Sequence, residues 1–115
     1  MKIHISWSEV DLMVQELVKQ IRLTSNQSPS IFGIPRGGLI PAVMLSHHLG
    51  IPLVNKPNQR SLVVDEIADT GHTLKSFTQR TAVLIWKRSS VIKPSFYGRL
   101  IDSDRWIVFP WEIDD

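Results

Sequence analysis

The residues best suited to chemistry lie in one run, residues 62–74, with the sequence LVVDEIADTGHTL. An apolar stretch ends in two adjacent carboxylates, Asp65 and Glu66, and Asp69 follows three residues later, before Thr70, Gly71, His72 and Thr73. Threonine hydroxyls and turn N–H groups at the start of a helix bind phosphate. Carboxylates accept hydrogen bonds from sugar hydroxyls or hold a hydrated Mg²⁺ ion. The run therefore predicts a sugar-phosphate ligand. The alternative is a capped helix with solvated acids.

A second junction, residues 33–39, reads GIPRGGL. Two adjacent glycines let the backbone turn sharply and approach a ligand, and the following helix start favours an anion. Arg36 adds a positive charge next to Gly37. The run lacks the spaced glycines of a dinucleotide site and the Lys-Ser/Thr pair of a Walker loop. The alternative is a simple turn with a solvated arginine.

Helices and short apolar strands surround these junctions. Apolar spacing predicts a helix over residues 8–23, with Ser8 as the N-cap and Asp11 three positions on. A second helix is expected over residues 39–49, closed by Gly50, with its two histidines on the surface or in packing contacts rather than on a metal. A third is expected from residue 70 to about residue 80.

Strand candidates alternate with these helices. They cover residues 30–34, 51–54, 61–65, 82–86, 96–101 and 106–109. The alternation predicts an α/β fold: one domain over residues 1–115, three-layered, with a mostly parallel central sheet and flanking helices. Both junctions follow strands, and open α/β sheets bind ligands at the carboxyl ends of their strands.

Composition sets limits on the function. The chain has 115 residues, 13 Lys and Arg against 11 Asp and Glu, and no cysteine. Disulfides and thiolate metal sites are thereby excluded, and the weak positive charge does not favour nucleic-acid binding. The longest apolar run, residues 39–45, is too short to span a membrane. We expect a soluble, cytoplasmic protein.

The motifs resemble those of a known family. Residues 64–73, VDEIADTGHT, resemble the phosphoribosyl-pyrophosphate (PRPP) motif of type I phosphoribosyltransferases, and residues 35–42, PRGGLIPA, resemble their pyrophosphate loop. Residues 105–112, RWIVFPWE, are similar to the C-terminal segment of the bacterial xanthine-guanine group, which also has a lysine after the strand matching residues 82–86. The resemblance extends from residue 31 to residue 112.

The resemblance implies a purine phosphoribosyltransferase that uses Mg²⁺ and PRPP. Its acceptor would be a 6-oxopurine such as guanine, xanthine or hypoxanthine. Asp65 and Glu66 would bind the ribose hydroxyls directly or through Mg²⁺, and Asp69 would handle the proton at the purine N7. The implied ligands of the 5′-phosphate are Thr70, Gly71, His72 and Thr73, and those of pyrophosphate are Arg36 and Gly37.

The same resemblance implies a base site near the C-terminus. Trp106 would stack on the purine, Lys87 would donate to its exocyclic O6, and the backbone of Ile107 would meet its N1/N2 edge. An aromatic platform with a cationic donor suits a 6-oxopurine. Taken singly, Trp106 could instead be a core tryptophan, and Lys87 a surface lysine.

One departure from the family concerns the lid. A long mobile loop precedes the PRPP motif in these enzymes, whereas only residues 55–61, NKPNQRS, fill that position here. A lid excludes water from reactive intermediates, so a second subunit would have to supply the cover, or catalysis would be slow. Parallel crossovers need about a dozen residues, so the short gap also predicts that the strand at residues 51–54 is short or displaced to an edge of the sheet. Family members are commonly dimers or tetramers, which predicts a homo-oligomer.

Two other hypotheses remain open on the sequence. A non-catalytic PRPP- or nucleotide-binding regulatory domain of the same fold would explain the short lid. A flavodoxin-like domain with an accidental motif would bind no PRPP at all.

Overall fold

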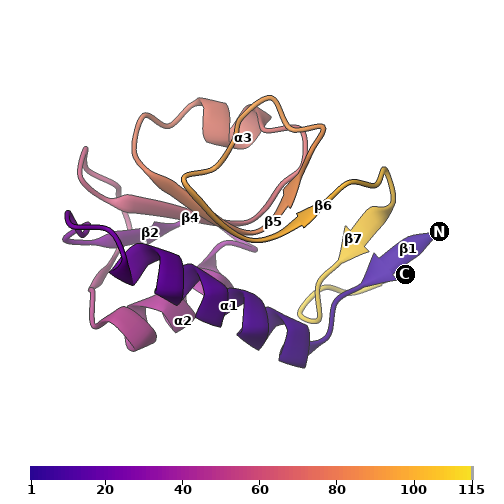
Figure 1. The fold of residues 1–115 in the computed structure, drawn as a ribbon, viewed down its shortest axis with the longest axis horizontal. Helices are drawn as coiled ribbons and strands as arrows, with labels where there is room; N and C mark the ends of the chain where they lie inside the picture. The colour runs from indigo at the N-terminus through magenta and orange to yellow at the C-terminus, as the bar shows by residue number, and fades with distance from the viewer. Residues whose placement is uncertain (115) are drawn as a thin grey trace.

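A five-stranded parallel sheet forms the centre of the molecule, with strand order β3-β2-β4-β5-β6. The structure, a computed structural model, describes residues 1–114 (Figure 1). The strands of this sheet are β2 (Ile31–Gly33), β3 (Leu53–Val54), β4 (Leu62–Ala68), β5 (Thr81–Lys87) and β6 (Phe96–Ile101). The expected α/β fold with a mostly parallel sheet and flanking helices is confirmed.

Two helices cover one face of this sheet: α1 (Trp7–Arg22) and α2 (Leu39–Leu49). The N-cap of α1 is Ser6, so the expectation of Ser8 was wrong. Ser6 Oγ accepts from the Glu9 backbone N–H, and the Glu9 carboxylate accepts from the Ser6 N–H. This reciprocal pair satisfies two N–H groups, which Ser8 and Asp11 do not achieve. Gly50 closes α2 as expected, donating to the Ser46 carbonyl.

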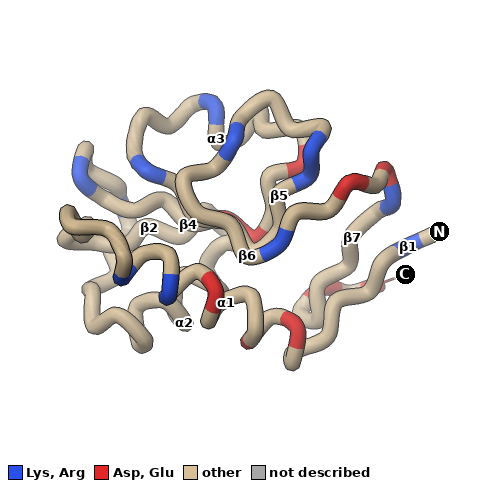
Figure 2. Tube along the Cα trace, viewed as in Figure 1, with Lys and Arg blue, Asp and Glu red and all other residues tan. Residues whose placement is uncertain are grey.

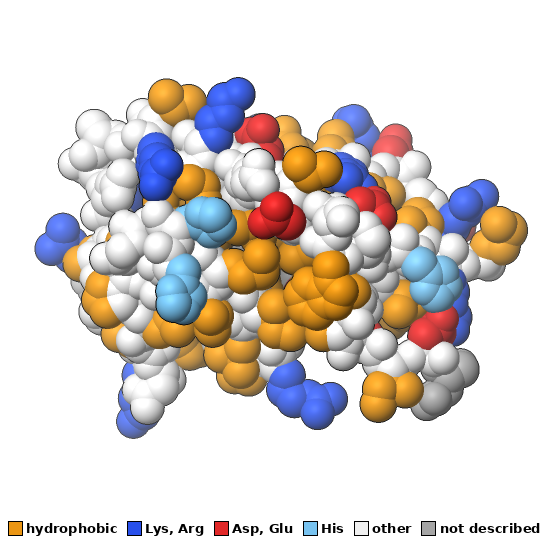
Figure 3. Space-filling view, turned by 90° about the horizontal axis from the view of Figure 1, so that it is seen from below, with side chains coloured by type: hydrophobic (Ala, Val, Ile, Leu, Met, Phe, Trp, Pro, Cys, Tyr) orange, Lys and Arg blue, Asp and Glu red, His pale blue; other side chains and the backbone are white. Residues whose placement is uncertain are grey.

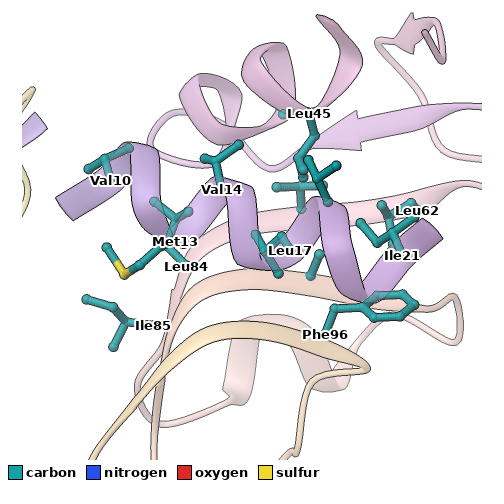
Figure 4. Packing of buried hydrophobic residues seen from close by; sticks show 14 of the residues in the cluster. Val10, Met13, Val14, Leu17, Ile21, Leu45, Leu62, Leu84, Ile85 and Phe96 are labelled. Carbon is teal, nitrogen blue, oxygen red and sulfur yellow. The ribbon is translucent and has the colours of Figure 1, made fainter. Parts of the chain in front are cut away.

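The main core lies between these helices and the sheet. Its apolar side chains project from one stripe of α1 onto β4, β5 and β6 (Figure 4). The α1 members are Val10, Met13, Val14, Leu17, Val18 and Ile21, at the spacing of one helical face. A smaller cluster around Leu74 and Val83 lies apart from this core, and Figure 1 shows α3 (His72–Lys75) and the β5–β6 connection across the sheet from α1.

Two sequence expectations about elements need correction. The third helix does not reach residue 80, because α3 has only four residues. The chain then turns through residues 76–80 into β5. The strand expected over residues 51–54 forms only at Leu53 and Val54, at the edge of the sheet beside β2. This edge position is the one that the short gap before β4 predicts.

A separate two-stranded parallel sheet joins the termini. It pairs β1 (Lys2–His4) with β7 (Trp106–Val108). The pairing fixes β7, the strand that carries Trp106 and Ile107, beside the start of α1. Within residues 1–114, no helix is long and apolar enough to cross a membrane.

The packing of the core predicts that two leucines of α1 contribute very differently to the free energy of unfolding. Leu17 is fully buried, whereas Leu12 is 59 % exposed. Replacing Leu17 by alanine leaves a cavity, so Leu17→Ala should lower the free energy of unfolding by about 2 to 5 kcal/mol. Leu12→Ala removes the same atoms from the surface and should change it by less than about 0.5 kcal/mol. Urea denaturation measures both, and equal losses would contradict this packing.

Candidate functional site

The two junctions meet at the carboxyl edge of the sheet, because β2 and β4 are adjacent and parallel. The Ile34 N–H donates to the Val64 carbonyl at 2.8 Å, which continues the ladder into the first junction. The Gly38 N–H then donates to the Ile34 carbonyl at 2.9 Å and closes the turn. The Pro35–Arg36 peptide bond is cis. The turn therefore lies directly against the strand that carries Asp65 and Glu66.

Gly37 and Glu66 are in close contact. A Cβ atom on Gly37 would lie 1.3 Å from Glu66 Oε2, so a side chain there would displace the Glu66 carboxylate from this position. The Asp65 carboxyl lies close enough to that of Glu66 for the two to interact. Asp65 is buried and accepts from the Glu66 backbone N–H at 2.9 Å.

Three pockets that share lining residues lie along this edge. The first, about 500 Å³, combines the Arg36 turn with the C-terminal segment. Its lining residues are Arg36, Gly37, Ile40, Glu66, Trp111, Glu112 and Ile113. The second, about 200 Å³, is lined by Glu66, Ile67, Asp69, Trp106, Ile107, Phe109 and Glu112.

The third pocket, about 80 Å³, lies within the turn from Ile67 to Leu74. Glu66 borders the first and second pockets, while Ile67 and Asp69 border the second and third. An extended ligand could therefore contact the arginine turn, the tryptophan strand and the threonine turn at once. The predicted residues Arg36, Gly37, Asp69, Trp106 and Ile107 are thus brought together with Glu66.

The threonine turn depends on Gly71, whose φ of +87° is disfavoured for other residues. A Cβ there would also lie 2.5 Å from Ser90 Oγ. The Val91 N–H donates to the Thr70 carbonyl at 2.8 Å, so the β5–β6 connection supports the turn. The sequence carries no signal that this connection supports the turn. Its contact with the Gly71 turn is what indicates that role.

The side chains of Thr70 and Thr73 are exposed at this turn, as is His72. The His72 N–H points at Thr70 Oγ1, 3.3 Å away. Thr70, Gly71 and Thr73 line the third pocket, whereas His72 does not. The turn therefore presents hydroxyl groups at the pocket, as a phosphate ligand requires.

Lys87 is buried at the end of β5, with 3 % of its surface exposed. Its Nζ donates to the Arg105 carbonyl at 2.6 Å and lies 3.7 Å from Asp69 Oδ1. The alternative of a surface lysine is therefore wrong. Lys87 does not line the second pocket itself but joins two segments that do, the Asp69 turn and the strand that begins at Trp106.

Trp106 projects into solvent at the second pocket, with 64 % of its surface exposed. The alternative of a core tryptophan is therefore also wrong, and a flat aromatic face is available for a ligand. Ile107, the next residue of β7, is buried. Alternation along the strand explains the difference.

Two residues near the C-terminus border the pockets without having been predicted to. Trp111 stacks on Phe109, with ring centroids 4.9 Å apart, and contacts Trp7 at 5.7 Å. Glu112 accepts from the Phe109 N–H at 2.8 Å and borders both larger pockets. The dense aromatic content of residues 106–111 is the one sequence signal that could have indicated them.

The carboxyl pair is electrostatically unfavourable on its own. Burial of Asp65 and the hydrogen bonding and charge of neighbouring Glu66 raise the pKa of Asp65 to about 8. Both causes disfavour the ionised form. A divalent cation near the pair would oppose both effects.

Asp65 and Glu66 are the residues that fit a magnesium ion. Among residues 1–114, no group of three or more His, Asp or Glu side chains could hold a metal by itself. Mg²⁺ commonly takes one or two carboxylates, keeps several waters and shares substrate phosphates, so a two-carboxylate pair suits it.

The segment that replaces the long lid lies away from the pockets. The Asn58 carbonyl accepts from Gln79 Nε2 at 2.9 Å and from the Ser61 N–H at 3.2 Å. Ser61 directly precedes β4 and Gln79 lies two residues before β5, which places this turn at the amino edge of the sheet. Residues 55–61 therefore do not cover the site.

Known proteins share this architecture. A purine phosphoribosyltransferase from Pyrococcus horikoshii is 32 % identical, with a TM-score of 0.83 over 99 % of this chain and 96 % of that one. The xanthine-guanine-hypoxanthine phosphoribosyltransferase of Helicobacter pylori is 26 % identical, with a TM-score of 0.83 over 98 % and 93 %. The xanthine-guanine phosphoribosyltransferase of Idiomarina loihiensis is 27 % identical over 95 % of this chain and 86 % of its own. No protein-family model matches.

A parallel sheet with anion-binding turns at its carboxyl edge defines the class of α/β proteins that bind phosphorylated ligands. The similarity to the three phosphoribosyltransferases extends over almost the full length of this chain and most of theirs, which identifies the family within this class. The chain belongs to the type I phosphoribosyltransferase family.

The carboxyl pair predicts how stability depends on pH. The folded-state pKa of Asp65, about 8, exceeds the ordinary pKa of 3.8, so between these pH values the folded chain retains a proton that the unfolded chain releases. Stability should therefore be greatest below pH 4 for this group and fall as pH rises to 8. Asp65→Asn removes this loss and should raise the melting temperature at pH 8.5 by several degrees, in buffer without divalent ions.

The matched control is Asp104→Asn, which changes an exposed carboxylate to the same amide. The pH dependence of its melting temperature should match that of the unmodified chain between pH 5 and pH 8.5. If Asp65→Asn also gives a parallel curve, the pair does not repel as described.

Proposed function

We propose that this chain transfers the 5-phosphoribosyl group of PRPP to a 6-oxopurine (guanine, xanthine or hypoxanthine) and releases pyrophosphate. The observation that carries the proposal is the chain of three pockets joined through Glu66, Ile67 and Asp69. Pyrophosphate, base and 5′-phosphate need three adjacent sites of this kind. The names of the relatives support a purine acceptor.

Phosphate groups would occupy the two ends of this row. The hydroxyls of Thr70 and Thr73 and the N–H groups of the Gly71–His72 turn would hold the 5′-phosphate. Arg36 and the Gly37 backbone would hold the pyrophosphate at the first pocket. Both proposals rest on the general affinity of glycine turns and arginine for phosphate oxygens.

The carboxyl pair would face the ribose. Glu66 borders the first two pockets. Together with Asp65 it would accept hydrogen bonds from the ribose hydroxyls, directly or through Mg²⁺ and its waters. When bound, Mg²⁺ supplies positive charge for the pyrophosphate oxygens. The raised pKa of Asp65 supports this placement, because a cation favours the ionised pair.

The base would lie in the second pocket against the exposed face of Trp106. Asp69 would exchange the proton at N7, and Lys87, 3.7 Å from Asp69, would donate to O6. The Arg105 carbonyl already accepts from Lys87 and leaves its remaining N–H bonds for the purine. The backbone of Ile107 would meet the N1/N2 edge.

The reaction breaks the C1′–oxygen bond to pyrophosphate and forms a C1′–nitrogen bond to the purine. The bonding electrons leave with the pyrophosphate, so negative charge grows at the first pocket while positive charge grows on the ribose. Arg36 and the turn N–H groups would stabilise the former, and the carboxyl pair the latter. Charged and polar groups that the fold already holds in position stabilise a transition state without the energetic cost of rearranging during the reaction.

One feature favours a non-catalytic PRPP-binding domain as a second candidate. Residues 55–61 lie at the amino edge and provide no cover against water. The similarity to purine phosphoribosyltransferases over the whole chain favours the enzyme. Binding of PRPP without base-dependent product would reverse that preference.

The direct test is release of pyrophosphate from PRPP and Mg²⁺ with guanine, xanthine, hypoxanthine, adenine or no base. Release should depend on a 6-oxopurine. Asp69→Asn removes the group that exchanges the N7 proton and should lower turnover about 100-fold or more, while PRPP affinity changes little. Unchanged turnover would remove Asp69 from the reaction.

A second variant tests the base site. Lys87→Met keeps the length of the buried side chain but removes its charge and its N–H donors. We expect a loss of kcat/KM for 6-oxopurines of about 10-fold or more, as for a charge-assisted hydrogen bond. Lys93→Met, an exposed lysine of the β5–β6 connection, is the control and should change kcat/KM little. Equal behaviour of the two variants would exclude Lys87 from base binding.

A further inference from the structure

The segments that form the amino edge of the central sheet, opposite the proposed site, contain basic residues but no acidic ones. Neither Asp nor Glu occurs in residues 23–64 or in residues 70–101, which include the loop after α1, the segment before β4 and the connection into β5. Figure 2 shows this edge at the far left, with blue segments and no red ones. Figure 3 shows the same end at its left, from the side of the helices, again with blue side chains and no red ones. The local potential at this edge is therefore positive.

A pocket of about 310 Å³ lies at this edge, and we call it the amino-edge pocket. Residues 26–29 of the loop after α1, residues 59–61 before β4 and Arg80 before β5 form its walls. Two arginines, Arg60 and Arg80, are among its lining residues, and no carboxylate is. Its volume is at the lower end of the range for small-molecule sites, so it suits a compact anion or a small anionic molecule.

The guanidinium of Arg80 is held in place by the fold. Its Nη2 donates to the Asn26 carbonyl and to Ser28 Oγ, the latter at 3.1 Å. Its Cζ lies over the Phe96 ring, 5.9 Å from the centroid. Within residues 1–114 these hydrogen bonds use Nη2 alone, which leaves the three N–H groups on Nε and Nη1 for a ligand or water. A side chain that is already ordered loses less conformational entropy when it binds.

The turn that carries Arg60 is also fixed. The Arg60 N–H donates to Asn58 Oδ1 at 2.8 Å, and Gln79 Nε2 donates to the Asn58 carbonyl at 2.9 Å. The Asn58 N–H in turn donates to Ser61 Oγ at 3.0 Å, and Ser61 is buried. The exposed Arg60 side chain therefore extends from a backbone that three side-chain hydrogen bonds hold at the pocket.

The two arginines lack an acidic partner. Neither belongs to an ion pair within residues 1–114. Like charges that share a pocket repel each other, and an anion between them replaces repulsion by attraction. The planar fork of arginine matches phosphate oxygens in particular. The amide side chains of Asn26, Gln27 and Gln59 also line the pocket and offer hydrogen bonds to the rest of a ligand.

We propose that the amino-edge pocket binds a metal-free phosphate group, either inorganic phosphate or the phosphate of a small polar molecule. Arg60 and Arg80 hold the phosphate oxygens from opposite walls. The pocket offers no carboxylate to Mg²⁺, and its two arginines repel that ion, so PRPP complexed with Mg²⁺ is directed to the carboxyl edge instead. Residues 59–61 of the segment that replaces the long lid thus form part of a second anion site.

The test is a titration of the ¹⁵N-labelled chain with sodium phosphate up to about 20 mM, followed by amide chemical shifts, in buffer without divalent ions. The amides of residues 26–28, 59–61 and 80 should shift together and reach saturation. Sodium chloride at the same ionic strength is the control and should not produce these shifts. Absence of saturation at these amides, or equal shifts with chloride, overturns the proposal.

Glucose 6-phosphate distinguishes the two sources of the phosphate group. If the amide side chains contact the rest of the ligand, its apparent affinity at the same amides exceeds that of phosphate, which supports a phosphorylated small molecule. A lower affinity than that of phosphate supports inorganic phosphate as the ligand. Failure of both probes to give saturable shifts at these amides overturns the proposal.

Arginine variants test the two walls of the pocket. Arg60→Gln removes an exposed charge and should weaken phosphate binding at these amides at least about 5-fold, as expected for a charge-assisted hydrogen bond. Arg80→Gln should have a similar effect, and Arg60→Gln keeps the test valid where the loss of the Ser28 contact unfolds the chain. Lys56→Gln is the matched control, because it removes the same charge from the same segment but does not line the pocket. Equal losses in Arg60→Gln and Lys56→Gln would indicate general charge attraction and overturn the site.

Discussion

The common direction of the five central strands is the constraint on which the rest of the structure depends. Because β2 and β4 end at one edge, the turns that follow them meet there, and strand β7 of the second sheet lies beside them at the second pocket. Gly37 and Gly38 lie at this edge, where the Gly37 backbone contacts the Glu66 carboxylate and Gly38 is packed against the Val64 and Ile34 backbone. A side chain on Gly37 would displace the Glu66 carboxylate, which borders the first and second pockets.

The same edge carries an electrostatic cost. Asp65 is buried beside Glu66, and its raised pKa reports that the pair is disfavoured until positive charge arrives. Buried Lys87 shows the complementary arrangement, since it already has Asp69 and the Arg105 carbonyl as partners. The charges around Lys87 are therefore balanced, whereas, within residues 1–114, the proposed ribose side around Asp65 and Glu66 carries two carboxyl groups and no cationic partner in contact with them. A ligand that brings a cation would correct this, which is the behaviour expected of a Mg²⁺-dependent PRPP site.

Much of this could be predicted from the sequence, because short apolar strands, glycine turns and hydroxyl residues have local causes. The α1 stripe, the end of α2 at Gly50 and the two junctions are of this kind. The burial of Lys87 and the exposure of Trp106 could not be predicted, since both depend on β7 pairing with β1 at the other end of the chain. The support of the threonine turn by the β5–β6 connection and the position of residues 55–61 likewise arise from tertiary contacts. The length of α3 was misjudged because residues 76–80 fit a helix but are needed to turn the chain into β5.

The central claim is that the arginine turn, the threonine turn and strand β7 form one ligand site. Titration of the ¹⁵N-labelled chain with PRPP and Mg²⁺, followed by amide chemical shifts, tests it most directly. The account predicts the largest shifts together in residues 36–38, 65–73 and 106–107, with little change in residues 55–61 at the opposite edge. Shifts concentrated near residues 55–61, or confined to one turn at saturation, would contradict it.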